Sequence, residues 1–214
     1  MPHISGPAAT KAFFGMPHLN RNVLCAIDII TTGPDTSEDT LLEIAVLPLD
    51  HMLRPHKTFL MFNMKMRPEK EVTSRQCGMR EEELAKCILE GQDRYVVADL
   101  FLDWVKKMEL RSNKKIVPLG WNWPKDSAYL RHWLGDGTFE DVFDWRYRDV
   151  LSIANYINDR ADCISEDPIY AKLDFNYLAN VHRVPSFQYR SATNNVNVLH
   201  ELFKQMVLNP GVVT

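Results

Sequence analysis

The sequence predicts an α/β protein with a mixed central sheet flanked by helices, and three observations support this fold class. Apolar segments of strand length occupy residues 23–30, 41–49 and 57–65. Later segments carry their apolar residues at helical spacing. One short apolar run, at residues 116–119, interrupts these helical segments. Strands and helices in this order are expected to pack around a single core.

The individual elements follow from turn signals and apolar spacing. Gly33-Pro34-Asp35 and residues 50–55 separate the first three strands, which predicts an antiparallel meander. The run at 116–119 reads as a short buried strand that ends at Asn122. Helices are predicted at 84–89, 96–110, 125–134, 148–157, 175–181 and 192–208.

Composition favours one compact domain. The chain has 214 residues, of which 45% are hydrophobic and 25% charged, so it can bury a sizeable core and is not disordered by composition. We expect an N-terminal arm at 1–22, flexible or packed rather than a transit peptide, a single domain at 23–208, and a tail at 209–214. The formal net charge of -3 provides no global positive field, so any nucleic-acid binding must come from a local patch.

The cysteines and the hydropathy of the sequence indicate in which cellular environment the protein is expected. The four cysteines form no CxxC pair, so neither a zinc site nor a disulfide framework is predicted, and a cytoplasmic or other reducing intracellular compartment is expected. No apolar run approaches the roughly 18 residues of a membrane span. The first 22 residues lack the apolar region of a secretory signal. We expect no membrane partner.

Three short motifs carry the candidate chemistry. The apolar strand around 24–33 places Asp28 near its end, with Ile30 two residues later. Residues 120–130 contain Asn122 and Asp126 ahead of an apolar helix. Residues 189–199 place Arg190 and Asn195 at the start of the last predicted helix. In order and spacing these segments resemble the three motifs of the DEDD 3′–5′ exonucleases, in their His-type branch, which includes proofreading exonucleases, oligoribonucleases and RNase T.

Further segments strengthen the resemblance. Residues 41–46 are similar to the second strand of that superfamily, and residues 74–84 are similar to its His-Gly-Ile-Thr-x-Glu-x-Leu segment, with Cys77 at the His position. Residues 146–154 are similar to its Arg-x-x-Asp-Thr-x-x-Leu-Ala stretch. These weak patterns, found in the same order, together imply a common RNase H-like exonuclease fold.

The resemblance also implies a degenerate catalytic set. In the superfamily, four carboxylates hold two divalent metals and a His takes a proton from the attacking water. Only Asp28 and Asp126 match acidic positions of these motifs, so metal binding there is expected to be weak or absent. Ile30 stands at the Glu position and cannot coordinate a metal, whereas Asn195, at the last Asp position, keeps an oxygen without charge. Arg190 stands at the His position and stays protonated, so it cannot serve as the base.

Other site residues have two interpretations each. Arg190 either pairs with Asp28 or Asp126 and locks the site, or it holds a phosphate. Trp121 or Trp123 could stack on bases, with the other expected in the core. Structural roles are expected for Glu43, Asp144 and Asp149. By the resemblance, the predicted nucleic-acid contacts are Thr31, Thr32, Asn122, Trp123 and Arg190.

The leading functional prediction is an exonuclease-like pseudo-enzyme that binds a single-stranded nucleic acid end or a protein partner without hydrolysis. No cofactor is expected for it. One alternative is an active 3′–5′ exonuclease in which Asp28 and Asp126 hold one Mg²⁺ or Mn²⁺ and a nearby acid substitutes for a lost ligand. Another is a protein-interaction scaffold or inhibitor, which the fold alone does not exclude.

Overall fold

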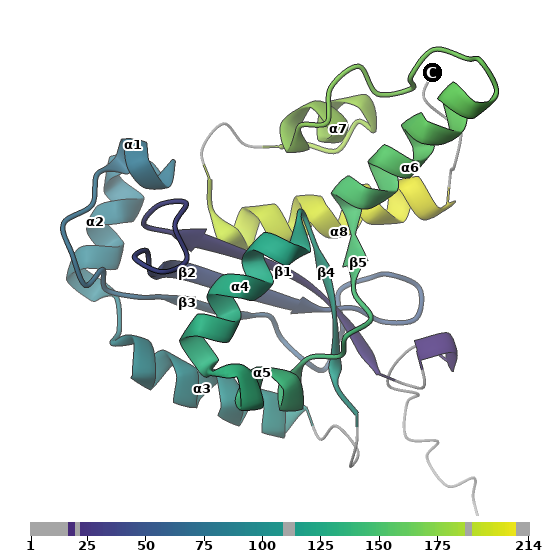
Figure 1. Ribbon diagram of the computed structural model, residues 1–214. Helices are drawn as coiled ribbons and strands as arrows, with labels where there is room; N and C mark the ends of the chain where they lie inside the picture. The colour runs from purple at the N-terminus through teal and green to yellow at the C-terminus, as the bar shows by residue number, and fades with distance from the viewer. Residues whose placement is uncertain (1–16, 20–21, 109–113, 187–189, 209–214) are drawn as a thin grey trace, which may run out of the picture.

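A five-stranded mixed sheet forms the centre of the part of the chain that the structure describes (Figure 1). The structure is a computed structural model that describes residues 17–19, 22–108, 114–186 and 190–208. The sheet has the order β3-β2-β1-β4-β5, with bounds β1 Val23–Thr31, β2 Leu41–Pro48, β3 Phe62–Lys65, β4 Ile116–Gly120 and β5 Arg148–Asp149. β1 to β3 pair antiparallel, whereas β4 is parallel to both β1 and β5. The predicted fold class and the antiparallel meander are therefore confirmed.

Helices cover both faces of this sheet. On one face α3 (Arg94–Lys107), α4 (Trp123–Leu134) and α5 (Asp136–Val142) share a core cluster with alternate β1 residues. On the other face the cluster is built with α6 (Val150–Cys163), α7 (Phe175–Val181) and α8 (Ala192–Leu208). The remaining helices are η1 (Pro17–Leu19), α1 (Ser74–Cys77) and α2 (Glu81–Glu90). None of the helices in the described ranges is long and apolar enough to cross a bilayer.

The alternation of side chains along β1 determines where its carboxylate points. Cys25 and Ile27 pack toward α3 to α5, whereas Ala26 and Ile30 pack toward α8. Successive side chains of a strand lie on opposite faces, so Asp28 shares the α8 face with Ala26 and Ile30. The whole strand is buried, and Asp28 is thus placed between the sheet and α8.

The structure differs from the sequence predictions in several elements, including α6, which runs from Val150 to Cys163 instead of over 148–157. The third strand begins at Phe62 rather than at residue 57, because Leu60 is 77% exposed and its carbonyl accepts a hydrogen bond from Trp104 Nε1 at 3.0 Å. A backbone carbonyl bound by a side chain leaves the ladder at that point. The short elements α1, α5 and β5 were not predicted.

The predicted termini fall largely outside the described residues. The structure does not describe residues 1–16, 20–21 and 209–214. It also does not describe residues 109 and 110, the end of the predicted helix 96–110. The described end of the predicted arm packs on the domain: Leu19 is 2% exposed and belongs to the core cluster beneath α8. Asn22 donates to Asp144 Oδ2 at 2.5 Å and accepts from the amide of Lys115.

Candidate functional site

Four of the residues singled out from the sequence lie around one cavity. Asp28 comes from β1, Asp126 from the first turn of α4, Asn195 from the first turn of α8, and Arg190 from the segment just before α8. Asn195 Nδ2 donates a hydrogen bond to Asp28 Oδ2 at 3.0 Å. This cavity, called here the Asp28 cavity, has a volume of about 330 Å³. The three motifs, distant in sequence, therefore meet at one place.

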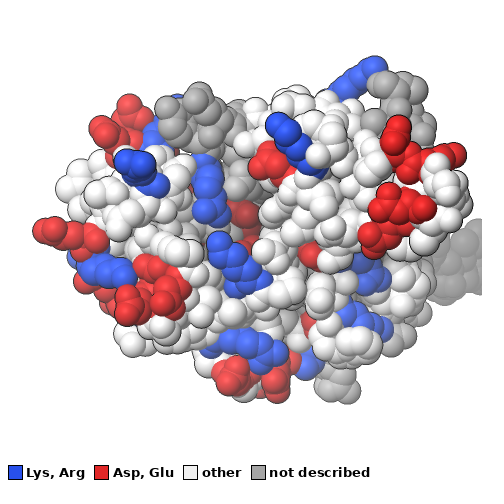
Figure 2. All heavy atoms as spheres, turned by 45° about the horizontal axis from the view of Figure 1, so that its top comes forward, with Lys and Arg blue, Asp and Glu red and all other residues white. Residues whose placement is uncertain are grey.

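An aromatic wall and further polar groups complete the Asp28 cavity. Trp121 is half-buried and its ring meets that of Phe175 edge-on, with 5.4 Å between centroids. Asn122 and Lys125 are exposed at the rim. Figure 2 looks onto this face and shows blue side chains around a hollow in the middle of the view, with red at its floor. The residues lining the cavity are Asp28, Trp121, Asn122, Lys125, Asp126, Asp174, Phe175, Asn176, Arg190 and Asn195.

The two carboxylates hold their protons more tightly than exposed acids do. Burial raises the pKa of Asp28 to about 7, against the lowering effects of the Arg190 charge and the Asn195 hydrogen bond. The pKa of Asp126 lies well above its ordinary value, because the group is buried and because Asp28 is close; Arg190 and Lys125 oppose this rise. Near neutral pH the cavity floor therefore carries less negative charge than two free carboxylates would.

Arg190 acts on these acids from a distance. Its Nη2 donates to the carbonyl of Ile29 at 3.4 Å, and its backbone amide donates to Gly78 O at 3.1 Å. Within the described ranges, no ion pair of 4.0 Å or less joins Arg190 to Asp28 or Asp126. The direct lock considered from the sequence is not formed, and the guanidinium stays exposed at the cavity.

Gly78 gives the Arg190 side chain its room. It has a φ of +71°, in the left-handed region that favours glycine. A Cβ at this position would lie 3.0 Å from Arg190 Cδ. A larger residue here would thus strain the backbone and press on the side chain that lines the cavity.

Ile30 and its cross-strand neighbour Glu43 form a structural unit rather than a ligand pair. Ile30 is fully buried in the core cluster. Glu43 lies opposite it in β2 and is 1% exposed. Its carboxylate accepts from the amides of Ala192 at 3.2 Å and Thr193 at 3.4 Å, and from Thr193 Oγ1 at 3.2 Å. Glu43 thereby satisfies the free amides at the start of α8, which confirms its predicted structural role.

Asp149 fixes the other side of the cavity. Its Oδ1 accepts from the Asn122 amide at 2.6 Å, and its Oδ2 accepts from Ser152 Oγ at 2.6 Å and from the Ser152 amide at 3.3 Å. It is the N-cap of α6, so its predicted role at a helix N-terminus is confirmed. Asn122 itself adopts a left-handed conformation, φ 57° and ψ 52°, and its side chain makes no cap hydrogen bond. Asp144 is likewise structural, since it pairs with Arg146 at 2.8 Å.

Three of the predicted nucleic-acid contacts are corrected by burial. Thr31 is 6% and Thr32 2% exposed; their hydroxyls donate to Gly33 O at 2.8 Å and to Asp39 Oδ1 at 2.9 Å, respectively. These hydroxyls shape the loop after β1 and do not line the Asp28 cavity. Trp123 is 4% exposed and packs against the rings of Phe139 and Phe143, so it belongs to the core.

Of the two tryptophans, Trp121 lines the Asp28 cavity and Trp123 does not. The residues on either side of Asn122 pack on different core clusters: Trp121 lies against the cluster of α6 to α8, and Trp123 belongs to the cluster of α3 to α5. Of the two, the residue within the first turn of α4 faces the sheet. The predicted start of that helix, at residue 125 instead of 123, left this distinction hidden. Phe175, Lys125 and Asp174 were also missed, because no motif marks them.

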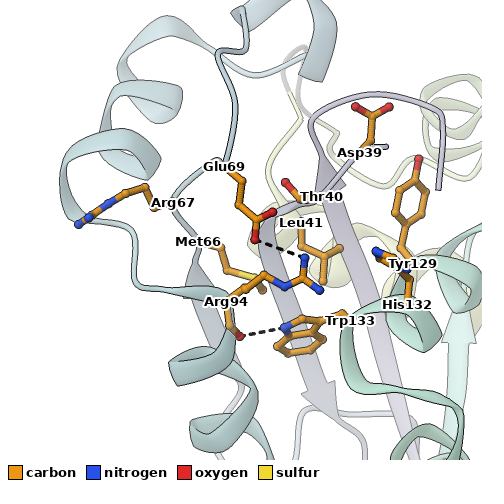
Figure 3. A pocket seen from close by; sticks show the side chains of 10 residues that line it. All are labelled: Asp39, Thr40, Leu41, Met66, Arg67, Glu69, Arg94, Tyr129, His132 and Trp133. Atoms are coloured by element: carbon orange, nitrogen blue, oxygen red, sulfur yellow. Dashed lines mark hydrogen bonds and ion pairs between the residues drawn. The ribbon is translucent and has the colours of Figure 1, made fainter. Parts of the chain in front are cut away.

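A small hollow elsewhere is too narrow for a ligand. Figure 3 shows Arg94 lying between Glu69, at 3.3 Å, and Trp133, whose Nε1 donates to the Arg94 carbonyl at 2.9 Å. The volume is about 10 Å³, close to that of a single water molecule. Its lining shares no residue with the Asp28 cavity. We assign it a packing role between α3, α4 and the sheet.

The residues of the Asp28 cavity do not fit a two-metal centre. Mg²⁺ and Mn²⁺ are bound mainly through carboxylate oxygens, and two metals require more of these than Asp28 and Asp126 provide. Asn195 directs its amide NH₂ to Asp28 instead of adding a charge. Over the described ranges, no three His, Cys, Asp or Glu side chains are grouped so that they could hold a metal ion.

Comparison with known proteins identifies the fold. No protein-family model matches the sequence, and neither does any curated protein. Among solved structures, the zinc-bound complex of E. coli exonuclease I with single-stranded DNA is similar, with a TM-score of 0.66 and 13% identity over 89% of this chain and 41% of that chain. Exonuclease I from Methylocaldum szegediense gives a TM-score of 0.62 and 14% identity, over 90% and 42%.

A second kind of nuclease has the same architecture. A 3′-exonuclease that recognises the histone mRNA stem-loop is similar at a TM-score of 0.61 and 13% identity, over 89% of this chain and 64% of that chain. The chain thus spans about two fifths of the length of the exonuclease I structures it matches. Identities this low establish the fold alone. The chain has the RNase H-like fold of the DEDD-type exonucleases.

Proposed function

We propose that this protein is an exonuclease-like pseudo-enzyme that binds the end of a single-stranded nucleic acid and does not hydrolyse it. The observation that carries the proposal is the pairing of Asp28 with the amide of Asn195, beside the exposed cation Arg190, in the Asp28 cavity. An amide and a guanidinium suit the binding of an anion, whereas hydrolysis in this fold needs carboxylates and a base.

Loss of hydrolysis follows from three positions that affect different catalytic requirements. Ile30 is buried hydrocarbon and supplies no ligand. Asn195 supplies no charge to a metal. Arg190 cannot accept a proton from water at any accessible pH. Because each loss alone lowers catalysis by a separate route, a single nearby acid does not restore it; the carboxylate of Glu43, for example, is already bound by the start of α8.

Binding is supported by the remaining lining of the cavity. Its volume of about 330 Å³ is in the range of small-ligand sites. Trp121 and Phe175 offer aromatic surface for a base, while Lys125 and Arg190 offer cations for phosphates. The similar structures of exonuclease I in complex with single-stranded DNA, and of the 3′-exonuclease that recognises an mRNA stem-loop, support a nucleic acid as the ligand.

Hydrolysis is tested with 3′-labelled single-stranded oligonucleotides in excess Mn²⁺ or Mg²⁺. We expect no degradation above a no-protein control. Degradation by the purified protein that disappears in Asp28→Ala would contradict the proposal and support the alternative, an active exonuclease with an altered metal site.

Binding is tested by fluorescence anisotropy of labelled single strands at low and physiological salt. We expect salt-sensitive binding, because phosphate contacts release counterions. Trp121→Ala should weaken it by about 1–3 kcal/mol, as expected for loss of one stacked base. Trp145→Ala is the matched control, since Trp145 is 84% exposed and lies outside the cavity. Absence of binding even at low salt would leave the protein-interaction scaffold or inhibitor.

A further inference from the structure

A second cavity adjoins the Asp28 cavity at Arg190. It has a volume of about 290 Å³ and is called here the Lys65 cavity. Arg190 lines both cavities, so its guanidinium stands where they meet. The residues lining the Lys65 cavity are Glu43, Asn63, Lys65, Arg80, Glu83, Arg190, Ser191, Thr193 and Asn194.

The chemistry of the two cavities differs. The Asp28 cavity has the aromatic side chains Trp121 and Phe175, whereas none of the described residues that line the Lys65 cavity is aromatic. Among the described residues, the latter has three cationic side chains and two side-chain amides, whereas its two hydroxyls, of Ser191 and Thr193, already donate to Glu43. Stacking of a base requires a ring, while a phosphate requires cations and hydrogen-bond donors. The Lys65 cavity is therefore suited to a phosphate rather than to a base.

The two carboxylates of the Lys65 cavity are already engaged. Glu43 receives hydrogen bonds from Ala192 and Thr193 at the start of α8. Glu83 is bound by Lys65 at 2.9 Å and by Lys86 at 2.7 Å. Lys65 Nζ also lies 3.9 Å from Glu43 Oε2. Because Lys86 also neutralises Glu83, and because donors at the start of α8 also bind Glu43, Lys65 can turn toward a ligand without leaving either acid without a partner.

We propose that the Lys65 cavity is a phosphate subsite for a nucleotide whose base lies on Trp121 in the Asp28 cavity, with Arg190 between the base and the phosphate. The phosphate is either the phosphodiester to the next nucleotide of a strand or a terminal phosphate on the last one. This inference rests on the proposed function and adds to it the part of the ligand that is recognised.

The experiment measures competition against a labelled single strand by anisotropy. The competitors are thymidine, thymidine 3′-monophosphate and the thymidine dinucleotide with a free 3′-hydroxyl. We expect at least one phosphate-bearing competitor to displace the strand at a tenfold or lower concentration than thymidine. If only the monophosphate competes better than thymidine, the subsite binds a terminal phosphate. If only the dinucleotide does so, the subsite binds a phosphodiester.

A matched pair of variants assigns the effect to the cavity. Lys65→Gln and Lys86→Gln each remove one lysine partner of Glu83, but only Lys65 lines the cavity. Lys65→Gln should reduce the advantage of the phosphate-bearing competitor to twofold or less and lower the salt dependence of strand binding by about one phosphate contact. Lys86→Gln should leave both unchanged.

Two outcomes overturn this inference alone. One is equal competition by thymidine and by both phosphate-bearing compounds while the labelled strand still binds. The other is an equal loss in Lys65→Gln and Lys86→Gln, which would indicate a general charge effect. If no labelled strand binds at low salt, the proposed function fails as well, so the two failures are distinguishable.

Discussion

Asp28 and Glu43 are buried carboxylates on neighbouring strands and on the same face of the sheet, and their surroundings differ. Glu43 accepts hydrogen bonds from three donor atoms of Ala192 and Thr193 at 3.2 to 3.4 Å. Asp28 accepts from Asn195 and otherwise faces a cavity, and burial raises its pKa to about 7. Two carboxylates that are both buried therefore need not have the same role. Glu43 stabilises the fold, while Asp28 costs stability and remains open to a ligand.

The largest expected effect is at Glu43. Glu43→Leu should lower the free energy of unfolding by about 3–5 kcal/mol, as expected when a buried, hydrogen-bonded charge is removed and its partners are left unpaired. Urea unfolding measures this. Glu83→Gln is the control, because Glu83 is partly exposed and its loss should cost about 1 kcal/mol or less. A decrease of less than 1 kcal/mol in Glu43→Leu would mean that Glu43 does not stabilise the fold, and that it does not differ from Asp28 in this respect.

A smaller effect is expected from the titration of Asp28. Its pKa is about 7 in the folded protein and near 3.8 in the unfolded chain, so the folded state binds the proton more tightly. Stability should accordingly fall as pH rises from about 4 to about 7 and then level off. About three pKa units correspond to about 2–4 kcal/mol after allowance for the neighbouring charges. Urea unfolding across this range should show a flatter profile in Asp28→Asn, with a residual slope from Asp126. Identical profiles would mean that Asp28 does not hold this proton.

The smallest effect on stability is expected at Arg190. The side chain is exposed and makes one long hydrogen bond, to Ile29 O, so Arg190→Gln should change the free energy of unfolding by less than about 1 kcal/mol. Strand affinity should nevertheless fall about tenfold, since one cation at the phosphate is lost. Arg190→Lys, which keeps the charge, should recover part of the affinity. A loss of several kcal/mol in stability would instead indicate that Arg190 compensates the acids directly.

The sequence predicted the sheet because apolar strands and helical spacing are visible in a single chain. The gathering of the motifs followed from the resemblance to the exonucleases, and Asp28 lies within β1, three residues before its end. The third strand was predicted too long because apolar residues such as Leu60 can also lie on the surface. The elements α1, α5 and β5 have between two and seven residues, too few to show a period.

Side-chain direction was the main limit on predicting the site. Thr31, Thr32 and Trp123 lie in or beside the right motifs, but their side chains turn into the loop or the core. The cap that Glu43 provides joins residues 149 positions apart in the chain, and only the folded arrangement brings them together. Contacts of that range depend on tertiary packing and leave no periodic signal in the sequence.

The two oxygens of Asp149 serve two different helices. One oxygen receives the amides of Asn122 and Trp123 at the start of α4, and the other receives Ser152 at the start of α6. Separation of the two helix ends would break both bonds to Asn122 and Trp123, whereas the bonds to Ser152 lie within the cap of α6. The amide protons of Asn122 and Trp123 should therefore exchange with solvent together, as one opening unit. Because Asp149 holds the starts of α4 and α6 together, this edge of the Asp28 cavity is already ordered before a ligand binds. Binding of a strand should therefore cost little conformational entropy of the protein there.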